Sequence, residues 1–143
     1  KEIIMQFLQS DSIKITVSPE QEKQLSSKEK IAKNIKDQHV LAFDIYNNET
    51  LIGFAMLRRF DAGSYFLWDF AIDRHFQNQH YGTRALQDLL TMMRVAYDMH
   101  TMTTTYKYGN EHAKRLYENI GFIQTDIVNE DGCHEVNMIY HYK

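Results

Sequence analysis

The chain has 143 residues, of which 43% are hydrophobic, and a formal net charge of −3 at pH 7, which predicts one domain over residues 1–143. Its mixed charges argue against nucleic-acid binding, and no apolar run is long enough to span a membrane. Cys133 is the only cysteine and the histidines lack a metal-ligand spacing, so we expect no internal disulfide and no metal site.

The first forty residues predict two helical pieces separated by a loop. Apolar side chains recur at helical spacing within residues 1–8, so a helix is predicted there. Residues 10–25 contain the only proline and predict a loop. Ser26 or Ser27 would then cap a second helix that runs to about Lys36.

The middle of the chain predicts a meander of strands. The predicted strands are Val40–Tyr46, Leu51–Leu57 and Tyr65–Ile72, joined by the turns Asn47–Thr50 and Asp61–Gly63. An amphipathic helix is predicted over Thr83–Met99, with a buried stripe at Leu86, Leu89, Leu90, Met93 and Tyr97. A strand at Thr101–Tyr106 follows, and the strand–helix–strand order predicts a parallel pair.

The last forty residues predict a helix and a closing hairpin. Asn110 would cap the helix and Gly121 would supply its left-handed end. The hairpin strands are Phe122–Val128 and Val136–Tyr142. Together the elements predict an α+β fold with a mixed, mostly antiparallel twisted sheet, flanked by helices and containing one parallel strand pair.

The loop between the third strand and the long helix suggests an anion site. Residues 77–82 are polar and end at Gly82, directly before the helix. The first N–H groups of a helix lack internal partners and carry partial positive charge, so a loop that directs them at one point favours phosphate. An ordinary tight strand-to-helix turn would use the same residues.

Two side chains outside the loop are candidates for chemistry. Asp69 lies within an aromatic strand, where an unpaired buried carboxylate costs several kcal/mol. It is either a solvent-facing or paired aspartate, or a group that accepts a proton from an amine. Tyr117 lies on the buried stripe of the helix that Asn110 caps, where core packing and a functional hydroxyl are both consistent with its position.

Two motifs resemble those of the GCN5-related N-acetyltransferases. The first is Phe-Gln-x-x-His-x-Gly-x-x-Ala-Leu from Phe76, and the second is Asn-x-x-Ala-x-x-Leu-Tyr-x-x-x-Gly-Phe from Asn110. The resemblance covers about residues 38–143, and the layout is similar to that of bacterial Blt-type spermine/spermidine acetyltransferases. It implies the fold of that family, with the parallel strands splayed apart to admit a cofactor. The family's first strand is not apparent in the sequence, so we expect it to be missing.

The resemblance implies a role for each matching position. Acetyl-CoA would be the co-substrate, with its pyrophosphate wrapped by backbone groups of Gln77, Asn78, Gln79, His80, Tyr81, Gly82 and Thr83. Ala71 and Ile72 would hydrogen-bond the pantetheine, and Asn110 would also bind the cofactor. Tyr117, near the sulfur, would protonate the departing thiolate. Asp69 is the candidate general base.

Two positions depart from the family pattern. His80 stands where the family has its first glycine, which leaves three interpretations: a tolerated substitution, a phosphate contact, or weakened cofactor binding. Trp68 stands where polyamine acetyltransferases often carry an acid, which leaves the identity of the base open, with Asp69 as our choice.

The predicted function is transfer of an acetyl group to a primary amine by direct attack in a ternary complex, with a polyamine such as spermidine or spermine as the expected acceptor. Peptide or protein N-terminal amines and aminoglycosides are alternative acceptors. A non-catalytic acyl-CoA-binding module is the alternative from another class. A homodimer and a cytoplasmic location are also expected, the latter because no signal-peptide pattern is present.

Overall fold

The computed structural model describes residues 4–142, which form one mixed sheet with helices on both faces. The strand order is β1-β2-β3-β4-β5-β7-β6, and only β4 and β5 run parallel. The strands are β1 Gln6–Gln9, β2 Val40–Asn47, β3 Thr50–Asp61, β4 Ser64–Ile72, β5 Thr101–Lys107, β6 Ile123–Glu130 and β7 Cys133–His141. The predicted α+β fold with one parallel pair is confirmed.

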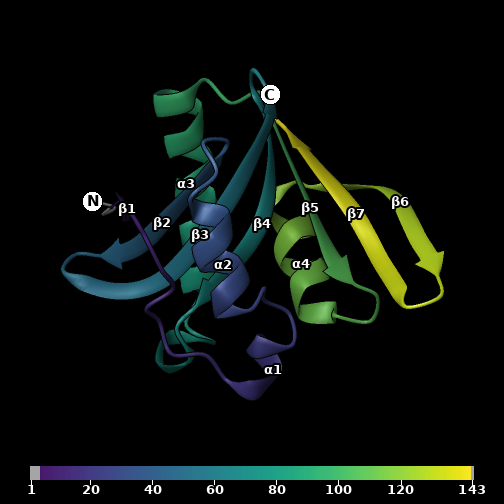
Figure 1. Ribbon diagram of the computed structural model, residues 1–143, viewed down its shortest axis with the longest axis horizontal. Coiled ribbons are helices and arrows are strands. Elements are labelled where there is room, and N and C mark those ends of the chain that lie inside the picture. Colours follow the sequence, from purple (N-terminus) through teal and green to yellow (C-terminus); the bar gives the residue numbers. More distant parts are fainter. Residues whose placement is uncertain (1–3, 143) are drawn as a thin grey trace.

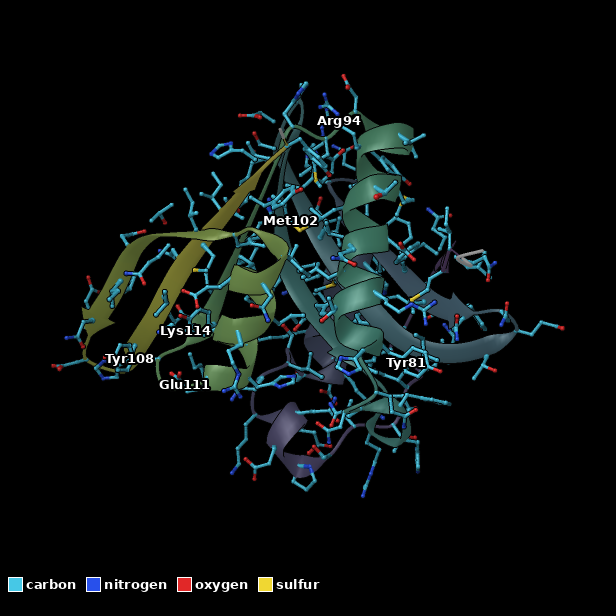
Figure 2. The ribbon with its side chains drawn as sticks, turned by 180° about the vertical axis from the view of Figure 1, so that it is seen from behind. Tyr81, Arg94, Met102, Tyr108, Glu111 and Lys114 are labelled. Atoms are coloured by element: carbon cyan, nitrogen blue, oxygen red, sulfur yellow. The ribbon has the colours of Figure 1, made fainter. Side chains whose placement is uncertain are left out.

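The helices divide between the two faces of the sheet. They are α1 Pro19–Glu22, α2 Lys28–Ile35, α3 Tyr81–Tyr97 and α4 Glu111–Ile120. Figure 1 shows α1 and α2 in front of the sheet, and Figure 2, turned by 180°, shows α3 and α4 covering the opposite face. The core is correspondingly split into a large cluster beneath α3 and α4 and a smaller one beneath α2. Within residues 4–142, no helix is both long and apolar enough to cross a membrane.

The predicted helix over residues 1–8 is wrong where the structure describes it, because Gln6–Gln9 forms β1. This strand pairs antiparallel with β2, from Gln6 opposite Tyr46 to Gln9 opposite Phe43. The ring of Phe7 packs edge-on against that of Phe43, with centroids 6.4 Å apart. A short apolar run fits either period, and pairing with the free edge of β2 decides for a strand. The sheet therefore has an edge strand where we expected the first strand to be missing.

The segment after β1 is more ordered than predicted. Pro19 does not break a helix but opens α1 at its first position, where proline is favoured. Ser18 and Gln21 form a capping box there, within the range predicted as loop. The second helix is confirmed as α2, and Ser27 caps it by accepting a hydrogen bond from the N–H of Lys30.

A β-bulge in β4 changes which side chains share a face. Leu57 lies opposite Leu67, whereas Met56 lies opposite Asp69, so Trp68 is an extra residue in β4. Strict alternation along the predicted strand would place Phe66, Trp68, Phe70 and Ile72 on one face, and the bulge makes this expectation wrong. Ile72 packs with Leu67 beneath α3, and Trp68 packs in the cluster beneath α2.

The parallel strands separate at the same point. β4 and β5 pair only from Ser64 opposite Thr101 to Leu67 opposite Thr104. Beyond these residues each strand continues, β4 to Ile72 and β5 to Lys107, and the two diverge (Figure 1). The bulge and the end of pairing together open the sheet over one half of β4.

Gly53 allows the end of β4 to lie close to β3. A Cβ at Gly53 would lie 2.9 Å from the carbonyl oxygen of Ala71 and 3.1 Å from the side chain of Ile72. We expect Gly53→Ala to displace this backbone and to lower the free energy of unfolding by about 1–3 kcal/mol, measured by urea denaturation. Gly82→Ala is the control, because its Cβ would meet only an ordinary contact at 3.7 Å. An unchanged stability of Gly53→Ala would contradict this account.

Candidate active site

A cavity of about 930 Å³ occupies the gap between the separated ends of β4 and β5. Tyr81, at the start of α3, and Glu111, at the start of α4, lie at the same end of the molecule (Figure 2). Most of the predicted site residues line this cavity, namely Asp69, Ala71, Ile72, Gln77, Asn78, His80, Gly82, Thr83, Asn110 and Tyr117. Gln79 and Tyr81 are not among the lining residues. Gln79 donates to the carbonyl of His75 at 3.4 Å, and the ring of Tyr81 packs edge-on against Phe76.

The turn after β4 is fixed by Asp73. One of its carboxylate oxygens accepts a hydrogen bond from the N–H of Thr16 at 2.9 Å, and the other accepts from the N–H of His75 at 2.9 Å. Burial alone would raise the pKa of Asp73, but these hydrogen bonds lower it below its ordinary value. The single turn of 3-10 helix at Arg74–Phe76 follows, so the chain reaches the N-terminus of α3 along a defined path.

The loop ends in the left-handed conformation at His80, which has a φ of 67°. Asn78, two residues earlier, also has a positive φ of 62°. A glycine at position 80 would adopt this geometry without cost. His80 is the N-cap of α3 but makes no side-chain cap hydrogen bond. The helix therefore begins two residues earlier than predicted, and Gly82 and Thr83 of its first turn line the cavity.

We expect His80→Gly to raise the free energy of unfolding by up to about 1 kcal/mol, because a left-handed non-glycine residue is strained. If the ring of His80 makes no phosphate contact, the affinity for CoA stays the same or improves. Calorimetry of thermal unfolding and of CoA binding measures both quantities. Asp98→Gly is the matched control, since Asp98 has a φ of 53° at the far end of α3. A tenfold or greater loss of CoA affinity confined to His80→Gly would show instead that the imidazole contacts the cofactor.

The exposed edge of β4 offers backbone hydrogen-bonding groups to the cavity. The N–H of Asp73 donates to the carbonyl of Ile52 at 2.7 Å, which fixes the alternation of the β3–β4 ladder. Under that alternation, the N–H and C=O of Ala71 point toward β3, whereas those of Phe70 and Ile72 point into the gap. An extended ligand could pair with them as an added strand. Phe70 is a binding candidate that the sequence did not indicate.

The α1 segment reaches the same edge. The side-chain amide of Gln21 donates to the carbonyl of Ile72 at 2.7 Å, and its oxygen accepts from the N–H of Ser18 at 2.8 Å. Gln21 is therefore a second residue that sequence reasoning missed, because it lies 51 positions away from Ile72.

Asp69 is buried at the point where β4 leaves β5, with 4% of its surface exposed. One carboxylate oxygen, Oδ1, accepts a hydrogen bond from the N–H of Ser26 at 2.8 Å. The other, Oδ2, is buried and has no hydrogen-bond partner among the described residues. Burial raises the pKa of Asp69 above its ordinary value, and the hydrogen bonds from Ser26 offset this in part. The free oxygen and the raised pKa are properties of a proton acceptor poised for use.

Tyr117 lies opposite, on α4. Asn110 caps that helix, accepting from the N–H of Ala113 at 3.2 Å. The Tyr117 ring is stacked on Tyr106 and packs against Phe122, with 7% of the residue exposed. Burial raises the pKa of Tyr117, a side-chain hydrogen bond with Thr104 lowers it, and the charge of Asp69 raises it. The hydroxyl therefore stays protonated at neutral pH and lies within electrostatic range of Asp69.

The chain matches the model of the acetyltransferase (GNAT) family over residues 5–122, and no curated protein matches it. Its fold is similar to that of spermidine N-acetyltransferase from Vibrio cholerae, solved with CoA and spermine, at 19% identity over 79% of this chain and 72% of that one, with a TM-score of 0.66. The ribosomal-protein-S18-alanine N-acetyltransferase from Escherichia coli is similar at 23% identity over 81% and 77%, with a TM-score of 0.67.

The IAA acetyltransferase from Bacillus cereus ATCC 14579 has a similar fold over nearly the whole of both chains. The match covers 97% of this chain and 99% of that one, at 15% identity and a TM-score of 0.74. These TM-scores establish a shared fold, and the family model covers most of the sequence that carries the cavity. The chain therefore belongs to the acetyltransferase (GNAT) family, the acetyl-CoA-dependent N-acetyltransferases.

Proposed function

We propose that this protein transfers the acetyl group of acetyl-CoA to a primary amine within the cavity between β4 and β5. One observation carries the proposal: a buried carboxylate, Asp69, and a buried phenol, Tyr117, line the same cavity. One oxygen of the carboxylate accepts a hydrogen bond and the other has no partner among the described residues. The family match supplies the reaction class, and the positions of these two groups supply the acid and the base.

The cofactor would lie across the open half of β4. The first turn of α3, with Gly82 and Thr83, would hold the pyrophosphate through backbone N–H groups and the helix dipole. The N–H and C=O of Phe70 and the N–H of Ile72 would pair with the pantetheine amides, since the C=O of Ile72 already accepts from Gln21. An N–H of β4 directed at the thioester carbonyl would stabilise the oxyanion by about 3 kcal/mol.

The chemistry would proceed by direct attack. The ammonium form of the acceptor would give its proton to Asp69, directly or through a water, and the free amine would attack the thioester carbon. The carbon–sulfur bond would then break, and Tyr117 would protonate the departing thiolate. The attacking nitrogen would lose its second proton to the Tyr117 oxygen, directly or through a water, which restores the phenol. The products are the N-acetylated amine and CoA, and no covalent enzyme intermediate is needed.

Initial-velocity kinetics test this order of events. When acetyl-CoA and the amine are varied together, a ternary-complex mechanism gives intersecting lines in double-reciprocal plots. Parallel lines would contradict direct attack and would require an acetylated enzyme.

The structural neighbours suggest two classes of amine acceptor. The spermidine N-acetyltransferases among the structural neighbours support a polyamine, and the ribosomal-protein acetyltransferase supports a peptide amine. Both rest on folds shared at low identity, and the side chains of Lys23, Lys30 and Lys107, which line the cavity, argue for a different amine. A homodimer and a cytoplasmic location stay predictions. The exposed side chains of Ile123 and Ile127 on the edge strand β6 support the former.

A further inference from the structure

The acceptor would enter from the face of the sheet that α1 and α2 cover. The bulge turns Trp68 toward this face, and the N–H of Ser26 holds Asp69 from the same side. Leu25 packs beside Trp68 in the smaller core cluster, and both line the cavity. The end of the cavity at Asp69, here called the acceptor end, is therefore bounded by β4 and by the α1–α2 segment.

The floor of this acceptor end is aromatic. Trp68 is half-buried, and Phe66, two residues earlier on β4, also lines the cavity. The Phe66 ring packs edge-on against Phe60, with centroids 6.3 Å apart, and Phe60 is 64% exposed. Apolar surface thus continues from the bulge outward past the cavity, and it suits a ligand with an apolar or aromatic body.

The rim of the acceptor end is basic. Lys23 and Lys30 from the α1–α2 segment and Lys107 from β5 line the cavity there. The ammonium of Lys107 donates to the carbonyl of Lys23 at 2.6 Å, which ties the segment to the sheet. Of the other basic side chains that line the cavity, His112 and Arg115 come from α4 on the opposite face, and His80 comes from the N-cap of α3.

The acidic groups at this end are few. Glu135, which lines the cavity, accepts from the hydroxyl of Thr105 at 3.5 Å and from the thiol of Cys133 at 3.2 Å. Among the described residues that line the cavity, Asp69 is the other carboxylate. Lys23 forms an exposed ion pair with Glu20 at 3.7 Å. Lys30 and Lys107 against two carboxylates, one of which serves the reacting amine, still disfavour a ligand with several positive charges.

We propose that the acceptor is a monoamine whose reacting nitrogen is its only positive charge and whose body is apolar or aromatic. The body would lie on Phe66 and Trp68. The ammonium would lie between the face of Trp68 and the free oxygen of Asp69, where a cation–π contact and the carboxylate both favour it. This inference rests on the proposed acetyl transfer and specifies its acceptor.

The test compares 2-phenylethylamine with spermidine as acceptors for the intact protein. We expect kcat/KM for 2-phenylethylamine to exceed that for spermidine by about tenfold or more. Trp68→Ala should raise KM for 2-phenylethylamine about tenfold with little change in kcat, and Trp68→Phe should restore most of the loss. A loss of kcat equal to the change in kcat/KM would instead assign Trp68 a merely structural role and overturn its part in binding.

Charge reversal at the rim is the second arm of the test. Lys30→Glu should lower KM for spermidine several-fold, and the fold should tolerate it, because a glutamate at this position completes a capping box with Ser27. Lys28→Glu is the matched control, in the same helical turn but outside the cavity. A preference for spermidine in the unmodified protein would overturn the acceptor assignment and leave acetyl transfer intact. CoA binding without turnover of either amine would overturn both.

Discussion

Asp69→Asn is expected to lower kcat/KM for the amine by about 100-fold or more while the protein stays folded. The asparagine keeps an oxygen for the N–H of Ser26 but cannot take a proton from the acceptor. The measurement is steady-state acetyl transfer by the purified variant, alongside its thermal unfolding. A variant that retains more than about a third of the parent rate would remove Asp69 from the role of base.

The same substitution should raise the melting temperature at neutral pH. Burial raises the pKa of Asp69 in the folded protein, so folding favours its protonated form. That contribution to stability is fully present below the unfolded-state pKa and is lost as the pH rises through the higher folded value. At pH 7 the buried charged carboxylate therefore lowers the stability of the folded protein, and asparagine removes this penalty. The difference in melting temperature between the variant and the parent should shrink toward pH 4. In the parent, the acidic limb of kcat/KM should fall with an apparent pKa above that of an ordinary carboxyl group.

Asp44→Asn provides the control for this prediction. Asp44 is also buried, with 6% exposed, and has an unpaired oxygen, but it lies outside the cavity. Its other oxygen forms an ion pair with Lys14 at 3.0 Å. Removing this charge leaves Lys14 without its buried partner. In contrast to Asp69→Asn, we therefore expect Asp44→Asn to lower the melting temperature and to leave the rate of acetyl transfer unchanged. A similar loss of rate in both variants would point to general structural damage.

Tyr117→Phe is expected to lower kcat by about 100-fold and to leave the affinity for CoA within about threefold of the parent value. The ring contacts with Tyr106 and Phe122 survive the change, and only the hydroxyl is lost. Steady-state kinetics measure kcat, and titration with CoA measures the affinity. Tyr65→Phe is the control, because it removes a hydroxyl from a buried tyrosine outside the cavity. Equal loss of CoA affinity and of rate in Tyr117→Phe would assign the hydroxyl to binding rather than to proton donation.

The elements with strong local signals could be predicted from the sequence. Asn110 and Gly121 delimit α4, and Ser27 begins α2, because capping chemistry acts within one turn of a helix. The strand–helix–strand order likewise gave the parallel pair of β4 and β5. These features depend on neighbours in the chain, and so a single sequence contains them.

The features that shape the acceptor end depend on distant partners. The bulge at Trp68 arises from the register of β4 on β3, and it reverses the facing that strict alternation predicts. The hydrogen bond from the N–H of Ser26 to Asp69 joins residues 43 positions apart, and no local sequence pattern predicts it. The strand β1 likewise forms only because β2 offers an edge. Sequence patterns thus indicated the two residues that we propose as acid and base, but not the surface that would select their substrate.

The most direct test of acetyl transfer in this cleft is mass spectrometry of the reaction of the unmodified protein with acetyl-CoA and a primary amine. We expect N-acetylated amine and free CoA in equal amounts, formed much faster than with Asp69→Asn or without protein. Binding of acetyl-CoA with no acetylated amine above the level of those two controls would contradict it. That result would leave a domain that binds the cofactor but does not catalyse the transfer.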